Sequence, residues 1–142
     1  MLISVEITNQ CEVAAGGFWV DFYLNPSPVP TGPNLQWNDA CSLNLCYGLT
    51  WPVLAGLQPG QSVVLTSTPD SFDVPRSFWM GYFTPGTTDL YLYVDSWNPG
   101  SFVGAVLELN ETNNRAERHG LLVPGAVGVP LDPSPAPAFP SR

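Results

Sequence analysis

The chain has 142 residues, which corresponds to one domain at about 150 residues per domain, and its net charge is −8. All four basic residues are arginine, so the chain has too little positive charge to neutralise a run of phosphates, and nucleic-acid binding is not expected. Hydrophobic residues make up 44% of the chain, enough for a buried core, yet no apolar run is long enough to span a membrane.

Apolar and polar residues alternate with a period of two along most of the chain, which is the pattern of half-buried β-strands. The clearest alternation covers residues 2–8, 18–24, 62–66 and 89–95, and further strands are predicted at 49–54, 78–83, 104–109 and 115–123. No segment has the 3.6-residue apolar period of a capped helix. Many short strands separated by Gly, Pro and Asn turns predict an all-β sandwich or a small barrel.

The alternation also predicts which side chains face the core. The inward residues form apolar rows that should meet between two sheets: Ile3, Val5, Ile7, Phe18, Val20, Phe22, Leu24, Leu90, Leu92 and Val94. The outward positions of two strands carry large aromatic rings, namely Trp19, Tyr23, Tyr91 and Tyr93. Two interpretations of these rings stay open: a loop or the tail covers them, or they form a surface for a partner or ligand.

Two proline-rich segments interrupt the strands. Residues 25–48 form a long loop, and residues 124–142 form an extended tail that is too rich in proline for a regular hydrogen-bonded ladder. We therefore expect a sandwich domain over residues 1–123 and an extended tail over residues 124–142. The candidate anchors of the tail are its large apolar residues Val127, Val129, Leu131 and Phe139. Docking on its own domain would stabilise a monomer, whereas docking on the next copy would propagate a filament.

Three stretches of the chain carry a resemblance to a known family. They are VEITNQCEVAAGGFWVDFYLNPSP, LQPGQSVVLTS, and DLYLYVDSWNPG followed by GAVLELNETNN. They resemble the bacterial cell-adhesion-related domain (CARDB) family, with matches at Asn9, Leu57, Pro59, Gly60, Val94, Asp95, Glu108, Asn110, Glu111, Asn113 and Asn114. The resemblance covers about residues 1–123 and implies an immunoglobulin-like antiparallel sandwich of seven strands. It also implies a secreted or surface-attached prokaryotic protein that is adhesive and has no catalytic residues.

The chain departs from this family at three places. Cys11 stands where the family usually has glycine, the loop at 25–48 is longer than the family minimum, and the tail lies outside the pattern. We expect the particular properties of this protein to lie in the loop and the tail.

The three cysteines allow several arrangements. Cys41 and Cys46 are predicted to close a small disulfide ring that restrains the long loop. The alternatives are free thiols or a zinc site made with Cys11 and His119, although no Cys-x2-Cys pair is present. Cys11 is expected to be a buried thiol, with an intermolecular bridge as the alternative.

Acidic and amide residues gather near the end of one strand and in the following turn. Asp95, Glu108, Asn110 and Glu111 offer hard oxygen ligands of the kind that Ca²⁺ binds, but their spacing is not that of an EF-hand. The alternative is that these side chains satisfy the backbone groups of turns, and this is the interpretation that we favour. No cofactor is therefore expected, with calcium kept open.

The motifs of common enzymes are missing. His119 stands in a charged strand, where a solvated edge residue is expected, and the chain has no Gly-x-Ser-x-Gly motif. We therefore expect a non-enzymatic module for adhesion and protein–protein assembly, with self-association through the tail. A carbohydrate-binding module that uses the outward rings is the alternative, and a passive spacer is a third possibility. The expected location is extracellular or at the cell surface, although no signal peptide is visible in this chain.

Overall fold

The computed structural model describes residues 2–30, 47–98 and 104–125. These residues form six β-strands and one short 3-10 helix. The elements in chain order are β1 (Ser4–Thr8), β2 (Phe18–Leu24), β3 (Tyr47–Val53), β4 (Ser62–Thr66), η1 (Val74–Arg76), β5 (Gly86–Val94) and β6 (Arg115–Val123). Within the described residues, no helix is long and apolar enough to cross a lipid bilayer.

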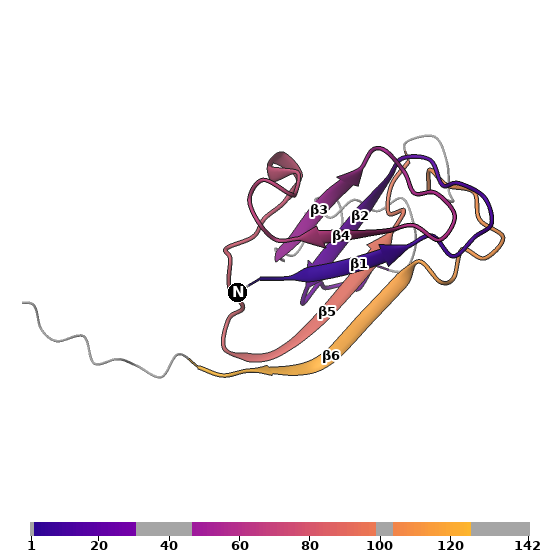
Figure 1. Cartoon of the computed structure of the whole chain (residues 1–142). Helices are drawn as coiled ribbons and strands as arrows, with labels where there is room; N and C mark the ends of the chain where they lie inside the picture. The colour runs from indigo at the N-terminus through magenta and orange to yellow at the C-terminus, as the bar shows by residue number, and fades with distance from the viewer. Residues whose placement is uncertain (1, 31–46, 99–103, 126–142) are drawn as a thin grey trace, which may run out of the picture.

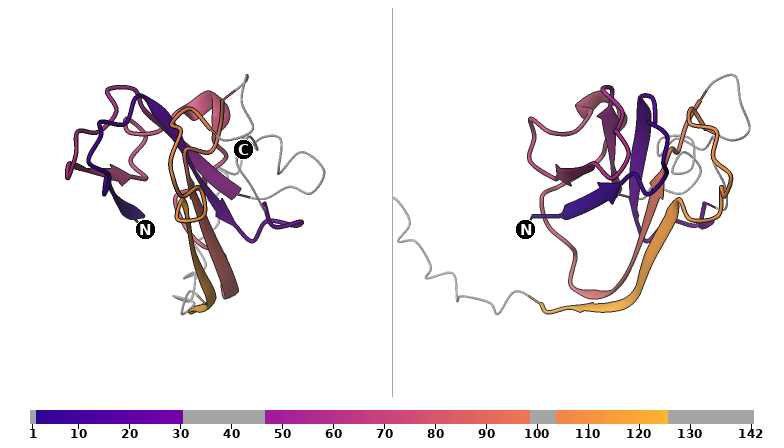
Figure 2. Two further views of the ribbon diagram at one scale, coloured as in Figure 1. Left: turned by 90° about the vertical axis from the view of Figure 1, so that its right-hand side faces the viewer. Right: turned by 45° about the vertical axis from the view of Figure 1, so that its right-hand side comes forward.

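The strands form two antiparallel sheets. β1 pairs with β4, and the other four strands pair in the order β3-β2-β5-β6. In Figure 1 the β1–β4 pair lies across the larger sheet, and the views of Figure 2 show the two sheets as separate layers. The prediction of an all-β chain is confirmed, and the two layers are compatible with a β-sandwich.

One hydrophobic core lies between the two layers. The apolar residues of β2 are buried in it together with Trp51 of β3, Ile7 of β1 and Leu65 of β4. The inward residues of β5, Val5 of β1 and Ile3 just before β1 are partly buried and pack against the same cluster. The predicted inward faces are therefore confirmed, because side chains of a strand point alternately to opposite faces.

Two predicted strands are wrong. Residues 78–83 contribute a single bridge, between Phe78 and Gly48, and residues 104–109 form bends and irregular backbone without a strand. At the second segment, the backbone N–H groups of Ala105 and Val106 donate to the carboxylate of Asp95 and are not available for a strand ladder. The seven-strand count is therefore not reached by the described residues, which contain six.

Candidate functional site

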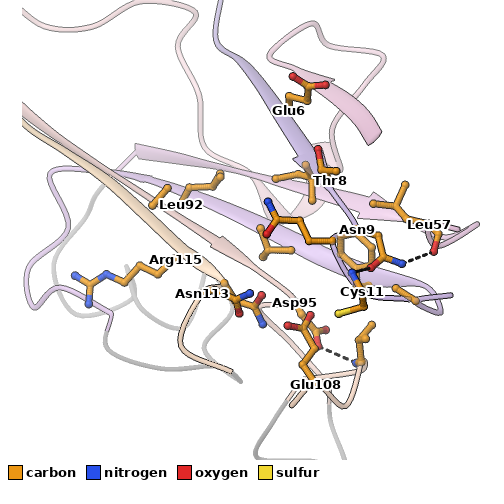
Figure 3. A pocket seen from close by; sticks show the side chains of 18 residues that line it. Glu6, Thr8, Asn9, Cys11, Leu57, Leu92, Asp95, Glu108, Asn113 and Arg115 are labelled. Carbon is orange, nitrogen blue, oxygen red and sulfur yellow. Dashed lines mark hydrogen bonds between the residues drawn. The ribbon is translucent and has the colours of Figure 1, made fainter. Parts of the chain in front are cut away.

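A cleft of about 260 Å³ lies between the two sheets on the side of β1 that faces away from β4. One wall is β1, from Glu6 to Thr8, and the other is the start of β6, at Arg115 and Ala116. Figure 3 shows the side chains of Glu6 and Thr8 on one side and those of Asp95 and Glu108 on the other. The apolar lining consists of Ile7, Ala15, Phe18, Leu57, Leu92, Val94, Val106 and Ala116.

The edge of β1 beside this cleft presents free backbone groups. Ser67 donates its N–H to the carbonyl of Ile3 at 3.0 Å, and Asn9 donates its N–H to the carbonyl of Gln61 at 2.9 Å. In an antiparallel pair, the residues that bond the partner strand alternate, so the odd-numbered residues of β1 bond β4. The even-numbered residues Ser4, Glu6 and Thr8 therefore direct N–H and C=O away from β4, where the described residues contain no strand to receive them.

Among the residues that the structure describes, no strand pairs with the outer edge of β6 either. Val94 donates its N–H to the carbonyl of Asn114 at 2.7 Å, and the register then assigns Ala116 to the residues that bond β5. Arg115 and Glu117 consequently direct their backbone groups away from β5. β6 is also exposed along almost its whole length, so both its outer edge and its faces meet solvent.

The opposite edge of the large sheet, at β3, is covered. The N–H of Thr50 donates to Oγ of Ser77 at 3.0 Å, and the carbonyl of Thr50 accepts from the N–H of Asp73 at 2.8 Å. A bridge between Gly48 and Phe78 continues this cover. Unpaired strand edges invite the addition of another strand. Within the described residues, the edge at β3 is protected and the two edges beside the cleft are open.

Asn9 shapes the end of the cleft. Its side-chain amide donates to the carbonyls of Val13 and Leu57 at 2.9 and 3.0 Å, and its Oδ1 accepts from the N–H of Cys11 at 3.0 Å. These bonds hold the turn after β1 and place Cys11 at the lining of the cleft (Figure 3). The expectation of a buried thiol is wrong, because Cys11 is a free and exposed cysteine.

Asp95 organises the opposite rim. It is buried, its Oδ1 accepts from Ala105 at 2.7 Å, and its Oδ2 accepts from Val106 at 2.8 Å. Burial raises the pKa of Asp95, these two bonds lower it, and the nearby carboxylate of Glu111 raises it, with a net upward shift. Burial also raises the pKa of Glu108, and the charges of Glu111 and Asp95 add to the shift.

The residues proposed as calcium ligands thus make contacts typical of turns. Oε1 of Glu111 accepts from the N–H of Glu108 at 2.9 Å, and Oδ1 of Asn110 accepts from the N–H and hydroxyl of Thr112 at 3.0 and 2.6 Å. No group of three or more His, Cys, Asp or Glu side chains among the described residues is arranged to hold a metal ion. These contacts are what the turn interpretation predicts, and the calcium interpretation gains no support from them.

The outward tyrosines form a second buried cluster on the other face of the large sheet. Tyr23 is fully buried, Tyr91 and Tyr93 are 6% exposed, and Val29 packs against them. The hydroxyl of Tyr93 donates to the carbonyl of Pro30. Of the two open interpretations, the structure therefore supports cover within the chain for the three tyrosines.

Trp19, the fourth outward ring, is partly exposed. It meets the ring of Trp97 edge to face, with centroids 6.5 Å apart, and the guanidinium of Arg76 lies 5.3 Å from its ring centroid. The four rings do not form a flat exposed strip, because the three tyrosines are buried.

His119 has carboxylates as its polar neighbours. Nε2 lies 3.0 Å from Glu117 and Nδ1 lies 3.5 Å from Asp89, while the ring packs edge to face on Tyr91. His119 is exposed, as expected for a residue at the edge of a sheet. Gly120 has φ of 65° and lies at the irregularity in the pairing of β5 with β6. Its N–H donates to Oδ1 of Asp89, and this hydrogen bond lowers the pKa of Asp89.

Several predicted residues lie outside the described ranges. These are the cysteine pair of the long loop and the four anchors of the tail: Cys41, Cys46, Val127, Val129, Leu131 and Phe139. Sequence reasoning missed the cleft itself and its free edges, although the polar alternation at Ser4, Glu6 and Thr8 marks the relevant residues of β1.

No protein-family model, curated protein or solved structure matches the chain. The chemistry of the cleft and of the strand edges around it is therefore the basis for assigning a function.

Proposed function

We propose that the chain is a non-enzymatic module for protein–protein assembly, with an immunoglobulin-like fold akin to the CARDB family and a place outside the cell or at its surface. Proteins, including further copies of the chain, are its partners in this proposal. The net charge of −8 argues against nucleic acids as partners.

The strand order supports the immunoglobulin-like part of the proposal. If the six strands are labelled B, C, C′, E, F and G in chain order, the larger sheet has the order C′-C-F-G and the smaller one pairs B with E. This is the arrangement of immunoglobulin sandwiches, in which strand A lies beside B. The described residues contain no strand at that position, and the corresponding edge is the free edge of β1.

The observation that carries the proposal is a cleft with an apolar floor and a polar rim, which lies between two strand edges that the described residues leave open. An extended segment that enters such a cleft gains backbone hydrogen bonds from the edge and buries alternate side chains in the floor, which is the mode of β-strand addition. The cleft volume of about 260 Å³ is below the range of about 300–1,000 Å³ typical of small-molecule sites, and this also favours a few side chains as its occupants.

The burial of Tyr23, Tyr91 and Tyr93 weakens the main alternative, a carbohydrate-binding module. Sugar faces stack on exposed rings, and of the four rings considered for that role only Trp19 is not buried. A passive spacer would need no open strand edge beside a cleft with an apolar floor.

Sedimentation velocity of the full chain over a wide range of concentrations tests the assembly function. We expect concentration-dependent association, accompanied by slower hydrogen exchange at the outward amides of Ser4, Glu6 and Thr8. If the chain associates but hydrogen exchange at these amides is unchanged, the copies associate through a surface other than the edge of β1. A monomer at every concentration and ionic strength would contradict self-assembly.

A further inference from the structure

We propose that the cleft between β1 and β6 receives residues 126–131 of a second copy of this chain, which adds as a strand parallel to β1 and joins copies head to tail. This inference rests on the proposed assembly function and names the partner of the same cleft. It is carried by the free edge of β1, the apolar floor beside it and the residue pattern of the tail.

The acceptor is the row of outward backbone groups on β1. Ser4, Glu6 and Thr8 direct their N–H and C=O toward the cleft side, while the side chain of Ile7 points to the floor and is buried. An added strand must therefore bond to the even residues of β1 and place its own apolar side chains on the same face as Ile7.

The donor segment has the pattern that such an acceptor needs. Val127, Val129 and Leu131 occupy alternate positions and share one face of an extended strand, whereas Ala126, Gly128 and Pro130 share the other. Residues 126–131 carry no charge. They therefore introduce no repulsion beside the acidic side chains of Glu6 and Glu108 that line the cleft.

Pro130 decides the direction of the added strand. Proline has no N–H, so a strand tolerates it only at a position whose N–H would not donate to a neighbouring strand. In an antiparallel pair with Val127, Val129 and Leu131 facing inward, the even-numbered residues of the tail would bond β1, and Pro130 would lack its donor.

In a parallel pair, a residue of β1 does not form hydrogen bonds with the tail residue directly opposite it. It forms them with the two tail residues before and after that opposite residue. With Gly128 opposite Glu6, the carbonyl of Val127 accepts from the N–H of Glu6, and the N–H of Val129 donates to the carbonyl of Glu6. Thr8 bonds Val129 and Leu131 in the same manner. The tail residues that form hydrogen bonds with β1 are then Val127, Val129 and Leu131, whose side chains point inward. Pro130 forms no backbone hydrogen bond with β1 and needs no N–H.

The segment comes from a second copy because the chain's own tail would have to reverse too sharply. β1 and β6 run in opposite directions (Figure 1), so a strand parallel to β1 runs opposite to β6. In the register above, Ala126 lies opposite Ser4, which leaves two residues between it and Val123, the last residue of β6. A two-residue connection joins neighbouring strands of one sheet, about 5 Å apart, whereas β1 and β6 belong to two different sheets. The tail of another copy is free of this restriction.

The contact is heterologous, since the tail of one copy meets the cleft of the next, and such contacts form open chains when the rotation does not close a ring. Each copy carries a net charge of −8, so the copies repel one another. Added salt screens that repulsion, and we expect association of the wild-type chain to increase with ionic strength.

Two variants of the full chain test the proposal in a complementation experiment. Val129→Asp places a charge on the inward face of the donor, with Ala126→Asp as the control that places the same charge on the outward face. Glu6→Pro removes an outward N–H of the acceptor that β4 does not use, with Glu6→Ala as the control that keeps it. Near-UV circular dichroism and the melting temperature establish that each variant is folded.

We expect Val129→Asp and Glu6→Pro to sediment as monomers when alone and to form a one-to-one heterodimer when mixed. The intact tail of Glu6→Pro then enters the intact cleft of Val129→Asp, and the chain cannot grow further. Both control variants should associate as the wild type does. Alkylation of Cys11, which lines the cleft, should slow at least several-fold on association.

The other outcomes overturn the inference in distinguishable ways. Assembly that persists in Val129→Asp would show that another surface joins the copies, so the inference would fail while the assembly function stands. A mixture that remains monomeric would exclude tail exchange between copies. A wild-type chain that is monomeric under all conditions would contradict both proposals. If Glu6→Pro is unfolded, Val129→Asp and Ala126→Asp still decide, because they change the tail and not the sheets.

Discussion

The indole N–H of Trp51 in β3 donates a hydrogen bond of 2.7 Å to the backbone carbonyl oxygen of Thr66 in β4. A fully buried side chain of the larger sheet is thereby bonded to the backbone of the smaller one. This bond matters because a two-stranded sheet is marginally stable by itself and depends on packing against another layer. The same two-stranded sheet carries the free edge of β1, so the position of the cleft depends on this contact between the layers.

Replacement of Trp51 tests that dependence. Trp51→Phe keeps an aromatic ring but removes the donor, which leaves the carbonyl of Thr66 without this partner and should destabilise the chain by about 1–3 kcal/mol. Urea denaturation measures the loss, with Trp19→Phe at a partly exposed position as the control. Equal stability of the two variants would mean that the bond between the sheets contributes little.

Truncation of core residues tests the two-layer packing. Phe22 is 3% exposed and contacts Trp51 edge to face, so Phe22→Ala should cost about 3–5 kcal/mol. Leu92 packs against the same core but is only partly buried and lines the cleft, so Leu92→Ala should cost less. The comparison is made by thermal and urea unfolding, and a larger loss for Leu92→Ala would contradict the assignment of the core.

Substitution of two glycines with similar backbone conformations distinguishes the cost of backbone strain from the cost of steric overlap. Gly60 and Gly104 have φ of 71° and 77°, but a Cβ at Gly60 would meet nothing within 4 Å, whereas one at Gly104 would overlap Oδ2 of Asp95. Gly60→Ala should therefore cost about 1–2 kcal/mol from the left-handed conformation alone. Gly104→Ala should cost more, because Asp95 must move away from Ala105 and Val106; similar melting temperatures would argue against this role of Asp95.

Glu108 should make stability depend on pH in a predictable direction. Its pKa is raised, first by burial and then by the charges of Glu111 and Asp95, so folding favours its protonated form. Its stabilising contribution is present at low pH and is lost as the pH rises through the raised pKa. Glu108→Gln, which is neutral throughout, should gain stability over the wild type near pH 7 and lose that gain below about pH 4. Asp70→Asn at an exposed site controls for net charge, and a gain that is independent of pH would contradict the assignment.

The cysteines can be distinguished by alkylation. Cys11 is exposed and free, so it should react with iodoacetamide in the native monomer without denaturant. If Cys41 and Cys46 form the predicted disulfide, mass spectrometry of denatured, unreduced protein should find one alkylated thiol, and three after reduction. Three modified thiols before reduction would exclude the disulfide, whereas a reduced ring should mainly increase proteolysis of the loop.

Alternation of apolar and polar residues is sufficient to predict the all-β class and the inward face of the main strands. In β2, the alternation of Phe18, Val20, Phe22 and Leu24 was sufficient to predict the inward face, because side chains of a strand point in alternate directions whatever the strand packs against. The same rule failed at residues 104–109, where the N–H groups that a strand would need are bonded to Asp95. That competition involves a residue ten positions away in sequence, and alternation contains no information about it.

What lies against each face and each strand edge follows from contacts between residues that are far apart in sequence. Alternation identified Tyr23 as outward but not that it is fully buried, and composition did not indicate that Cys11 is exposed. The cleft exists because β1 pairs with β4 in one layer while β6 pairs with β5 in the other, which leaves their two open edges beside each other. Strand pairing of this kind joins residues more than 50 positions apart, and its energy comes from contacts that form only when both layers are assembled.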